Sequence, residues 1–247
     1  MRSLGVLCAR GSSKRLPRKH LLPLQGLPLV AWMCRAAAAS GLSRVVITTE
    51  DDEIARIASE NGAEVPFRRE ARLAEDYASD FDIVVDALDR VEAAERRRYD
   101  VVVMLQPTTP FTWAEDIDGC VARLARDGGL AACFTAKPIS EPAQWMFVEG
   151  PDGRAQALLD GIGSNAVAHK QLLPKCWFPS GAAYAVRTDS FRQQKRVYAT
   201  PFAIQPMPAE RSVDIDDEVD FLVADALARA KHFAPVALVE RVAPAGM

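Results

Sequence analysis

Apolar and polar positions follow two different periods along the first 135 residues. Short runs of apolar and β-branched residues predict buried strands, and segments with an apolar residue every three or four positions predict amphipathic helices. The predicted strands occupy residues 4–9, 44–49, 101–105 and 131–135, and the predicted helices occupy 29–39, 51–61, 80–97 and 114–126. This alternation predicts an α/β fold with a doubly wound, mostly parallel sheet and right-handed crossovers.

The alternation stops between Pro138 and Pro179, where proline, glycine and polar residues dominate. Short strand-like pieces at 145–148 and 154–158 indicate an inserted arm and not another strand–helix unit. Strand character returns at 181–186 and 202–205, and a last helix is predicted over 217–231. Its apolar residues are expected on one face: Val219, Leu222, Val223, Ala226, Leu227 and Ala230. We therefore divide the chain into an α/β domain (1–136 and 180–235), an arm (137–179) and a tail (236–247).

The composition excludes several classes of protein. The chain of 247 residues has 30 Lys+Arg against 33 Asp+Glu, a net charge of −3, which argues against a non-specific nucleic-acid binder. No apolar run approaches the roughly 18 residues of a membrane span, and the first apolar stretch is too short for a signal peptide. Five widely spaced cysteines without a CxxC pair are typical of reduced thiols, so we expect a cytoplasmic protein.

The charge is unevenly distributed, because five cations lie within residues 10–19, directly after the first predicted strand. In α/β sheets, ligands bind beyond the carboxyl ends of the strands, where this loop must lie. Its small residues and cations suit a polyphosphate, although its spacing matches neither GxxxxGK[ST] nor GxGxxG. The alternative is a solvated basic surface loop.

The residues from Ala9 to Leu29 resemble the signature of the acylneuraminate cytidylyltransferases, also called CMP-sialic acid synthetases. Residues 48–55, 62–69 and 73–79 are similar to later motifs of that family. The resemblance implies a nucleotide-diphospho-sugar transferase fold and binding of CTP. The implied nucleotide-binding residues are Arg10, Gly11, Ser13, Lys14, Lys19, Arg69 and Ser79.

Two positions in this region depart from the family pattern. His20 stands where the family usually has asparagine. Asp80 stands where a second serine usually follows Ser79, and Asp80 is also a suitable N-cap for the helix predicted from residue 80.

Polar residues Gln106-Pro107-Thr108-Thr109-Pro110 end the most uniformly apolar strand. A glutamine offers a donor and an acceptor, which suits a neutral sugar or base amide. The segment resembles the family's Q-P-T-S-P, which implies that Gln106 and Thr108 contact the sugar. The alternative is an ordinary strand-to-helix turn capped by Thr109 or Thr112.

Two carboxylates, Asp214 and Asp216, lie two residues apart before the last predicted helix. In an extended segment such side chains point the same way and can hold one Mg²⁺ together with substrate phosphates. Capping of the helix by Asp216 or Asp217 is the alternative. Residues 211–221 closely resemble the family's R-S-V-D-I-D string, whose two aspartates hold the metal.

The arm is the region that departs most from the family pattern. The resemblance implies that it dimerises the protein and reaches a neighbouring subunit's active site. Further candidate sugar contacts are Gln144, Lys170, Gln171 and Tyr184, with Lys170 in place of an arginine that would pair with the sugar carboxylate. His169 is either a base or a surface residue. Ser180 replaces an asparagine. Such departures favour a non-standard nine-carbon keto acid, and the run from Lys14 to Lys19 favours the pseudaminic or legionaminic branch.

The sequence therefore predicts a Mg²⁺-dependent cytidylyltransferase that makes a CMP-sugar and pyrophosphate from CTP and a nonulosonic acid. Arg10, Lys14, Lys19 and Asp214 are the expected catalytic residues. The alternatives are a CMP-KDO-type synthetase and a non-catalytic nucleotide-binding protein of the same fold.

Overall fold

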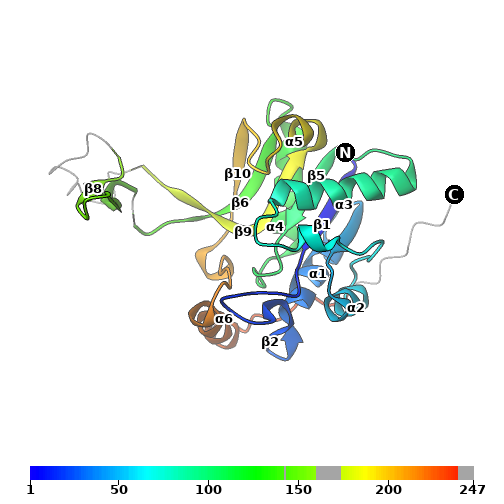
Figure 1. Cartoon of the computed structure of the whole chain (residues 1–247), viewed down its shortest axis with the longest axis horizontal. Coiled ribbons are helices and arrows are strands. Elements are labelled where there is room, and N and C mark those ends of the chain that lie inside the picture. The colour runs from blue at the N-terminus through cyan, green and yellow to red at the C-terminus, as the bar shows by residue number, and fades with distance from the viewer. Residues whose placement is uncertain (142, 160–173, 239–247) are drawn as a thin grey trace.

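A six-stranded sheet forms the centre of the protein (Figure 1). The computed structural model describes residues 1–141, 143–159 and 174–238. The strands are β1 (Ser3–Cys8), β4 (Arg44–Thr48), β5 (Val101–Leu105), β6 (Ala132–Pro138), β9 (Trp177–Arg187) and β10 (Phe202–Pro206). Their spatial order is β10-β6-β9-β5-β1-β4. All neighbours are parallel except β9, which runs antiparallel to both β5 and β6. This arrangement confirms the predicted mostly parallel α/β sheet.

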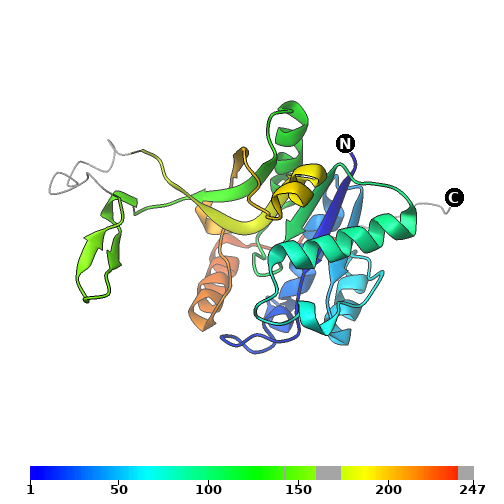
Figure 2. The same ribbon diagram turned by 45° about the horizontal axis from the view of Figure 1, so that its top comes forward.

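Helices cover both faces of the sheet, which gives three layers (Figure 2). The helices are α1 (Leu29–Ala39), α2 (Asp52–Glu60), α3 (Asp80–Glu95), α4 (Ala114–Arg126), α5 (Thr188–Gln194) and α6 (Glu218–Lys231). One face is covered by α1, α2 and α4, whose apolar residues form a single core cluster with β1, β4 and β5. The other face is covered by α3 and α5. None of the helices in the described part of the chain combines the length and apolar character that a membrane span requires.

The boundaries of the predicted helices agree with the structure to within two residues, whereas β9 begins four residues before its predicted start. In α6, Val219 and Leu222 belong to the predicted apolar face but are 67% and 60% exposed. The helix instead packs through Ala224 and Ala228 against a cluster that contains Trp32 and Phe111. Phe221 and Leu227 are partly buried against the same cluster, whereas Val219, Leu222 and Val223 are exposed.

The remaining elements are short. They are β2 (Pro23–Leu24), β3 (Leu27–Pro28), β7 (Phe147–Glu149), β8 (Ala155–Ala157) and the 3₁₀ turns at Lys19–Leu21, Ala71–Leu73, Ala143–Trp145 and Ala209–Arg211. The strands β2 and β3 form one antiparallel hairpin, and β7 and β8 form another.

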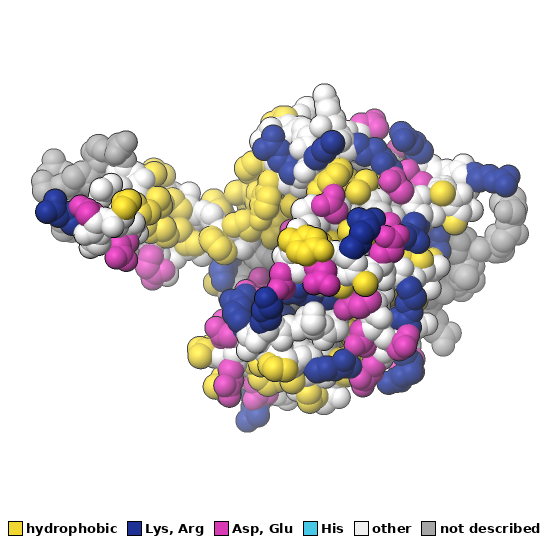
Figure 3. Space-filling model, viewed as in Figure 1, with side chains coloured by type: hydrophobic (Ala, Val, Ile, Leu, Met, Phe, Trp, Pro, Cys, Tyr) yellow, Lys and Arg dark blue, Asp and Glu magenta, His cyan; other side chains and the backbone are white. Residues whose placement is uncertain are grey.

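The arm leaves the body on the extended ends of β6 and β9, which stay paired out to Pro138 and Trp177. Both strands therefore cross the borders predicted for the arm. The β7–β8 hairpin lies at its far end (Figures 1 and 2). Hydrophobic side chains are exposed on the arm and its stem, among them Trp145, Phe147 and Phe178, and Figure 3 shows this apolar surface continuing onto the body.

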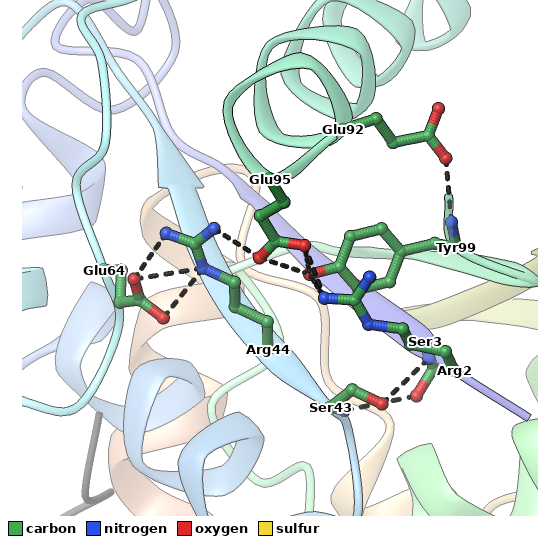
Figure 4. A network of polar contacts seen from close by, with 8 residues as sticks. All are labelled: Arg2, Ser3, Ser43, Arg44, Glu64, Glu92, Glu95 and Tyr99. Atoms are coloured by element: carbon green, nitrogen blue, oxygen red, sulfur yellow. Dashed lines mark hydrogen bonds and ion pairs between the residues drawn. The ribbon is translucent and has the colours of Figure 1, made fainter. Parts of the chain in front are cut away.

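A polar network closes the amino edge of the sheet (Figure 4). Arg44 donates to Glu64 at 3.0 Å and to Glu95 at 2.8 Å. Tyr99 donates to the same Glu95 at 3.0 Å, and Arg2 pairs with it from the start of β1. Burial, together with the neighbouring carboxylate of Glu95, raises the pKa of Tyr99 to about 12. These contacts join β1, β4, α3 and the start of β5 at the edge of the sheet opposite the carboxyl ends of its parallel strands.

Candidate active site

A cavity of about 370 Å³ lies at the carboxyl ends of β1 and β5, a volume within the range of small-molecule sites. Segments from distant parts of the chain meet there, as expected for the ligand-binding edge of an α/β sheet. Eight of the predicted site residues line it: Arg10, Ser13, Lys19, Arg69, Gln106, Thr108, Asp214 and Asp216. The structure therefore brings the basic loop, the Gln106 turn and the acidic pair into one site.

Each of the five cations in the loop between β1 and the 3₁₀ turn at Lys19–Leu21 is paired with a carboxylate. The pairs are Arg10–Asp76 (2.7 Å), Lys14–Asp76, Arg15–Asp216 (2.7 Å), Arg18–Asp51 (2.8 Å) and Lys19–Asp216 (3.0 Å). Asp76 and Asp216 line the cavity, so four of the five cations are paired with carboxylates of the cavity wall.

Gly11 contributes to the shape of this loop but does not line the cavity. Its N–H donates to Glu50 Oε1 at 2.6 Å, so this N–H is already satisfied within the protein. A Cβ at Gly11 would lie 2.6 Å from Asp51 Oδ2. Gly11 is thus required for close packing of the loop on the β4–α2 connection.

His20 contacts the backbone of the basic loop at Arg10. Its Nδ1 lies 3.0 Å from the carbonyl oxygen of Arg10, which can only accept, so Nδ1 carries the proton. Burial lowers the pKa of His20 to about 4, and the nearby charges of Lys19, Arg69 and Arg10 act in the same direction. His20 is therefore neutral at physiological pH.

Arg69 and Ser79 were both predicted to bind the nucleotide, but only Arg69 lines the cavity. Arg69 is buried and donates to the backbone carbonyl and the hydroxyl of Thr48, at 2.5 and 3.1 Å, and it reaches the cavity wall. Ser79 does not line the cavity. Its hydroxyl is the N-cap of α3 and accepts from the N–H of Asp82 at 3.1 Å.

Asp80 takes the place in the cavity wall that the sequence assigned to Ser79. The interpretation of Asp80 as the N-cap is therefore wrong, because the adjacent serine performs that role. Burial raises the pKa of Asp80. The two neighbours exchange their expected positions because the helix begins at Asp80, one residue earlier than a capping Asp80 would require.

The Gln106 turn forms the wall next to the acidic pair, and Gly181 of β9 packs against this wall. A Cβ at Gly181, which has φ +84°, would lie 2.9 Å from Asp214 Oδ2 and 3.1 Å from Gln106 Oε1. Gly181 thus lets the strand approach both side chains. The alternative of a capping threonine is wrong, since Thr109 and Thr112 donate to carbonyls within the turn and Trp113 is the N-cap of α4.

Tyr184 does not line the cavity, contrary to expectation. It is 6% exposed and packs against Phe134 and Tyr198. The strand alternation that turns Gly181 toward Asp214 directs Tyr184 into the core under α3. Ser180 is also buried and donates to Thr135 Oγ1 at 2.7 Å.

Neither Asp214 nor Asp216 is the N-cap of α6. Asp217 caps α6, and Asp220 accepts from the N–H groups of Asp216 and Asp217 in return. Burial raises the pKa of Asp214, and the charge of Asp216 acts in the same direction. Asp216 is also partly buried, but its pKa is lowered by Lys19 and then by Arg15.

This pair fits a divalent cation. Asp214 Oδ1 is buried and has no hydrogen-bond partner among the described residues, and the second carboxylate stands close enough to raise its pKa. A buried anionic oxygen without a donor is costly unless a cation satisfies it. Two carboxylates together with substrate phosphates are a usual Mg²⁺ environment.

A buried ion pair anchors the segment that carries these aspartates. Arg211 makes two contacts with Asp116 of α4, one of them at 3.0 Å, and its guanidinium lies 4.0 Å from the Trp113 ring centre. The carbonyl of Thr108 accepts from the N–H of Ile215 at 2.9 Å. The acidic pair is therefore held in register with the Gln106 turn.

The remaining predicted sugar contacts belong to the arm. Lys170 and Gln171, with His169, lie outside the described residues, and Gln144 is placed only by its backbone in the 3₁₀ turn Ala143–Trp145. Sequence reasoning missed Asp76, Glu50 and the positioning role of His20. Asp76 and Glu50 stand within the motifs quoted for the resemblance, but only the fold shows that they face the basic loop.

Comparison with known proteins decides the family. Residues 4–146, more than half of the chain, match the family described as Cytidylyltransferase. The chain belongs to the cytidylyltransferase family. Its members transfer a cytidylyl group, so this cytidylyltransferase is a nucleotidyltransferase, and the matched residues include the basic loop, Arg69 and the Gln106 turn.

Individual relatives of this cytidylyltransferase match over nearly its whole length. A pseudaminic acid cytidylyltransferase of Campylobacter jejuni is 26% identical over 94% of this chain and 98% of its own. A CMP-N,N'-diacetyllegionaminic acid synthase of Legionella pneumophila is 29% identical over 92% and 96%. A solved CMP:2-keto-3-deoxy-manno-octonic acid synthetase in complex with CTP has a TM-score of 0.67, with 19% identity over 94% of this chain and 100% of that one. The last likeness shows the common fold.

Proposed function

We propose that this cytidylyltransferase activates a nine-carbon 2-keto-3-deoxy sugar acid with CTP, giving the CMP-sugar and pyrophosphate in a Mg²⁺-dependent reaction. The observation that carries the proposal is the meeting of Lys19 and Arg10 with Asp214 and Asp216 in one cavity. Lys19 and Arg10 supply positive charge for a triphosphate, and Asp214 and Asp216 supply anionic oxygens for a divalent cation.

The chemistry is a single displacement at phosphorus. The anomeric 2-hydroxyl attacks the α-phosphorus in line and loses its proton to solvent, the new C–O–P linkage forms, and the bond to the β-phosphate oxygen breaks with pyrophosphate as the leaving group. Positioning and charge neutralisation account for most of the catalysis in such transfers. Arg10, Lys14 and Lys19 neutralise the charge that develops on pyrophosphate, while Ser13 and Arg69 hold the nucleotide and Gln106 and Thr108 face the sugar.

Asp214 and Asp216 are the residues that would hold the metal. When bound, Mg²⁺ polarises the α-phosphate and lowers the pKa of the attacking hydroxyl. The unpartnered Oδ1 of Asp214 supports this assignment.

The sugar is proposed from the relatives, whose names specify pseudaminic and diacetyllegionaminic acid. We propose a cytoplasmic homodimer joined through the arm, since apolar side chains are exposed along it. In that arrangement Gln144, Lys170 and Gln171 contribute to the sugar site, and Lys170 is the cation for the sugar carboxylate.

Pyrophosphate release with CTP and Mg²⁺ tests the function, using pseudaminic, legionaminic, N-acetylneuraminic and 3-deoxy-manno-octulosonic acids as acceptors. We expect release with one of the nine-carbon acids. Preference for the eight-carbon acid would replace the proposal with a CMP-KDO-type activity. Binding of CTP without turnover of any acid would indicate a non-catalytic nucleotide-binding protein.

A further inference from the structure

Asp76 binds two of the cations assigned to the triphosphate. Its Oδ1 lies 2.7 Å from Arg10 Nη1, and its other oxygen pairs with Lys14. Arg10 also reaches the carbonyl of Ala74, at 3.4 Å. Asp76 stands in the cavity wall, on the segment between the 3₁₀ turn at Ala71–Leu73 and α3.

This pairing competes directly with a bound triphosphate. Phosphate oxygens and a carboxylate are the same kind of acceptor for a guanidinium or an ammonium group. The Lys14 ammonium and then the Arg10 guanidinium hold the pKa of Asp76 below its usual range, so the carboxylate is charged at neutral pH. While both cations face Asp76, much of their charge is neutralised.

The pairs are also exposed enough to exchange. The side chain of Asp76 is 48% exposed and that of Lys14 is 82% exposed, and ion pairs of this kind contribute little net stability. A phosphate carries more charge than a carboxylate and can take the same donors without disturbing the core. By contrast, the Arg211–Asp116 pair is fully buried and fixed.

We propose that Asp76 is an exchangeable counter-ion of the triphosphate site. It holds Arg10 and Lys14 between turnovers, releases them to the triphosphate of CTP, and takes them back as pyrophosphate leaves. The inference rests on the proposed function and deepens it, because it names a residue that sets nucleotide affinity and product release without bonding to the reacting atoms.

The test is the Asp76→Asn variant, with CTP and inorganic pyrophosphate binding measured separately by calorimetry in the absence of sugar. The amide keeps the shape and removes the charge. We expect both ligands to bind about threefold to tenfold more tightly at low salt, and the gain to shrink at high ionic strength. In turnover, pyrophosphate should become a stronger product inhibitor by a similar factor.

Glu75→Gln is the matched control. Glu75 is the adjacent acid in the cavity wall and makes no ion pair within the described residues. The Glu75→Gln substitution removes one negative charge, as Asp76→Asn does, but leaves the pairs of Asp76 with Arg10 and Lys14 in place. A smaller gain than that of Asp76→Asn is expected, and an equal gain would overturn the proposal because the effect would then be one of overall charge.

A double-mutant cycle with Lys14→Gln isolates the pair. The gain from Asp76→Asn should shrink when Lys14 is absent. Unchanged or weaker binding of CTP and pyrophosphate by Asp76→Asn would overturn the proposal. This failure differs from that of the proposed function, in which Asp76→Asn tightens CTP binding as expected but no sugar acid is converted by the unmodified protein.

Discussion

Lys19 Nζ lies 3.0 Å from Asp216 Oδ1, so a predicted phosphate-binding lysine and a predicted metal-binding aspartate are bound to each other. Lys19 begins the 3₁₀ turn after the basic loop, and Asp216 precedes α6. Their contact spans 197 positions of sequence. The two halves of the proposed chemistry are therefore one electrostatic unit, and a change in either residue alters the other.

Asp216→Asn should separate nucleotide binding from turnover. The substitution frees Lys19 and Arg15 from a carboxylate, so we expect CTP measured with EDTA to bind about threefold more tightly. Turnover with Mg²⁺ should fall by about 100-fold or more because a metal-holding oxygen is lost. Calorimetry and the pyrophosphate assay measure the two effects. Retention of full Mg²⁺-dependent turnover would show that Asp216 holds no metal.

Asp214→Asn should stabilise the protein while inactivating it. The amide removes a half-buried charge whose Oδ1 has no partner among the described residues and whose neighbour is Asp216. We expect a gain of about 1 kcal/mol in the free energy of unfolding, measured by urea denaturation without divalent cations, together with loss of turnover. A destabilised but active variant would contradict both the electrostatic account and the metal assignment.

Gly181→Ala should damage the site more than it damages the fold. The position has φ +84°, and the new Cβ would press on Asp214 Oδ2 and Gln106 Oε1. We expect a loss of about 1–3 kcal/mol in stability and a fall in kcat/KM of about tenfold or more. Gly128→Ala is the control, since nothing lies within 4 Å of a Cβ there. Equal kinetics for the two variants would mean that Gly181 does not shape the site.

His20 should make stability depend on pH in a defined window. Its pKa is lowered to about 4 in the folded protein from an ordinary value of 6.5, so between these values the unfolded chain binds more protons. As pH falls from 6.5 to 4, this difference removes up to about 3 kcal/mol from the free energy of unfolding. His20→Asn lacks this contribution, and its stability should decline less across the window. Parallel curves for the two proteins would refute the assignment.

The sequence was sufficient for the sheet and for most of the helices because their apolar periods are strong. The predicted helices at 29–39 and 114–126 match α1 and α4 to the residue. The seven-residue α5 buries few apolar side chains and has no period to detect. For α6, periodicity gave the helix but not its buried face, because alanine packing against Trp32 and Phe111 depends on tertiary neighbours.

At the site, the resemblance identified residue types but not their partners. Arg10, Lys19 and Asp216 were predicted as separate groups, and only the fold reveals that each cation has a carboxylate opposite it. The sequence also did not predict that Ser79 caps α3 and Asp80 lines the cavity. A shift of one residue in the start of the helix decides which of the two side chains has which role.

The strand β9 connects the arm to the site. It begins in the arm at Trp177, passes Asp214 and Gln106 at Gly181 and ends at Arg187. Its pairing with β6 shifts register between Phe134 and Ala136, where Thr135 Oγ1 accepts from Ser180 and Ala183 instead. The arm and the backbone that packs against Asp214 are therefore parts of one continuous strand, so the direction of the arm and the packing beside the acidic pair are set by the same eleven residues.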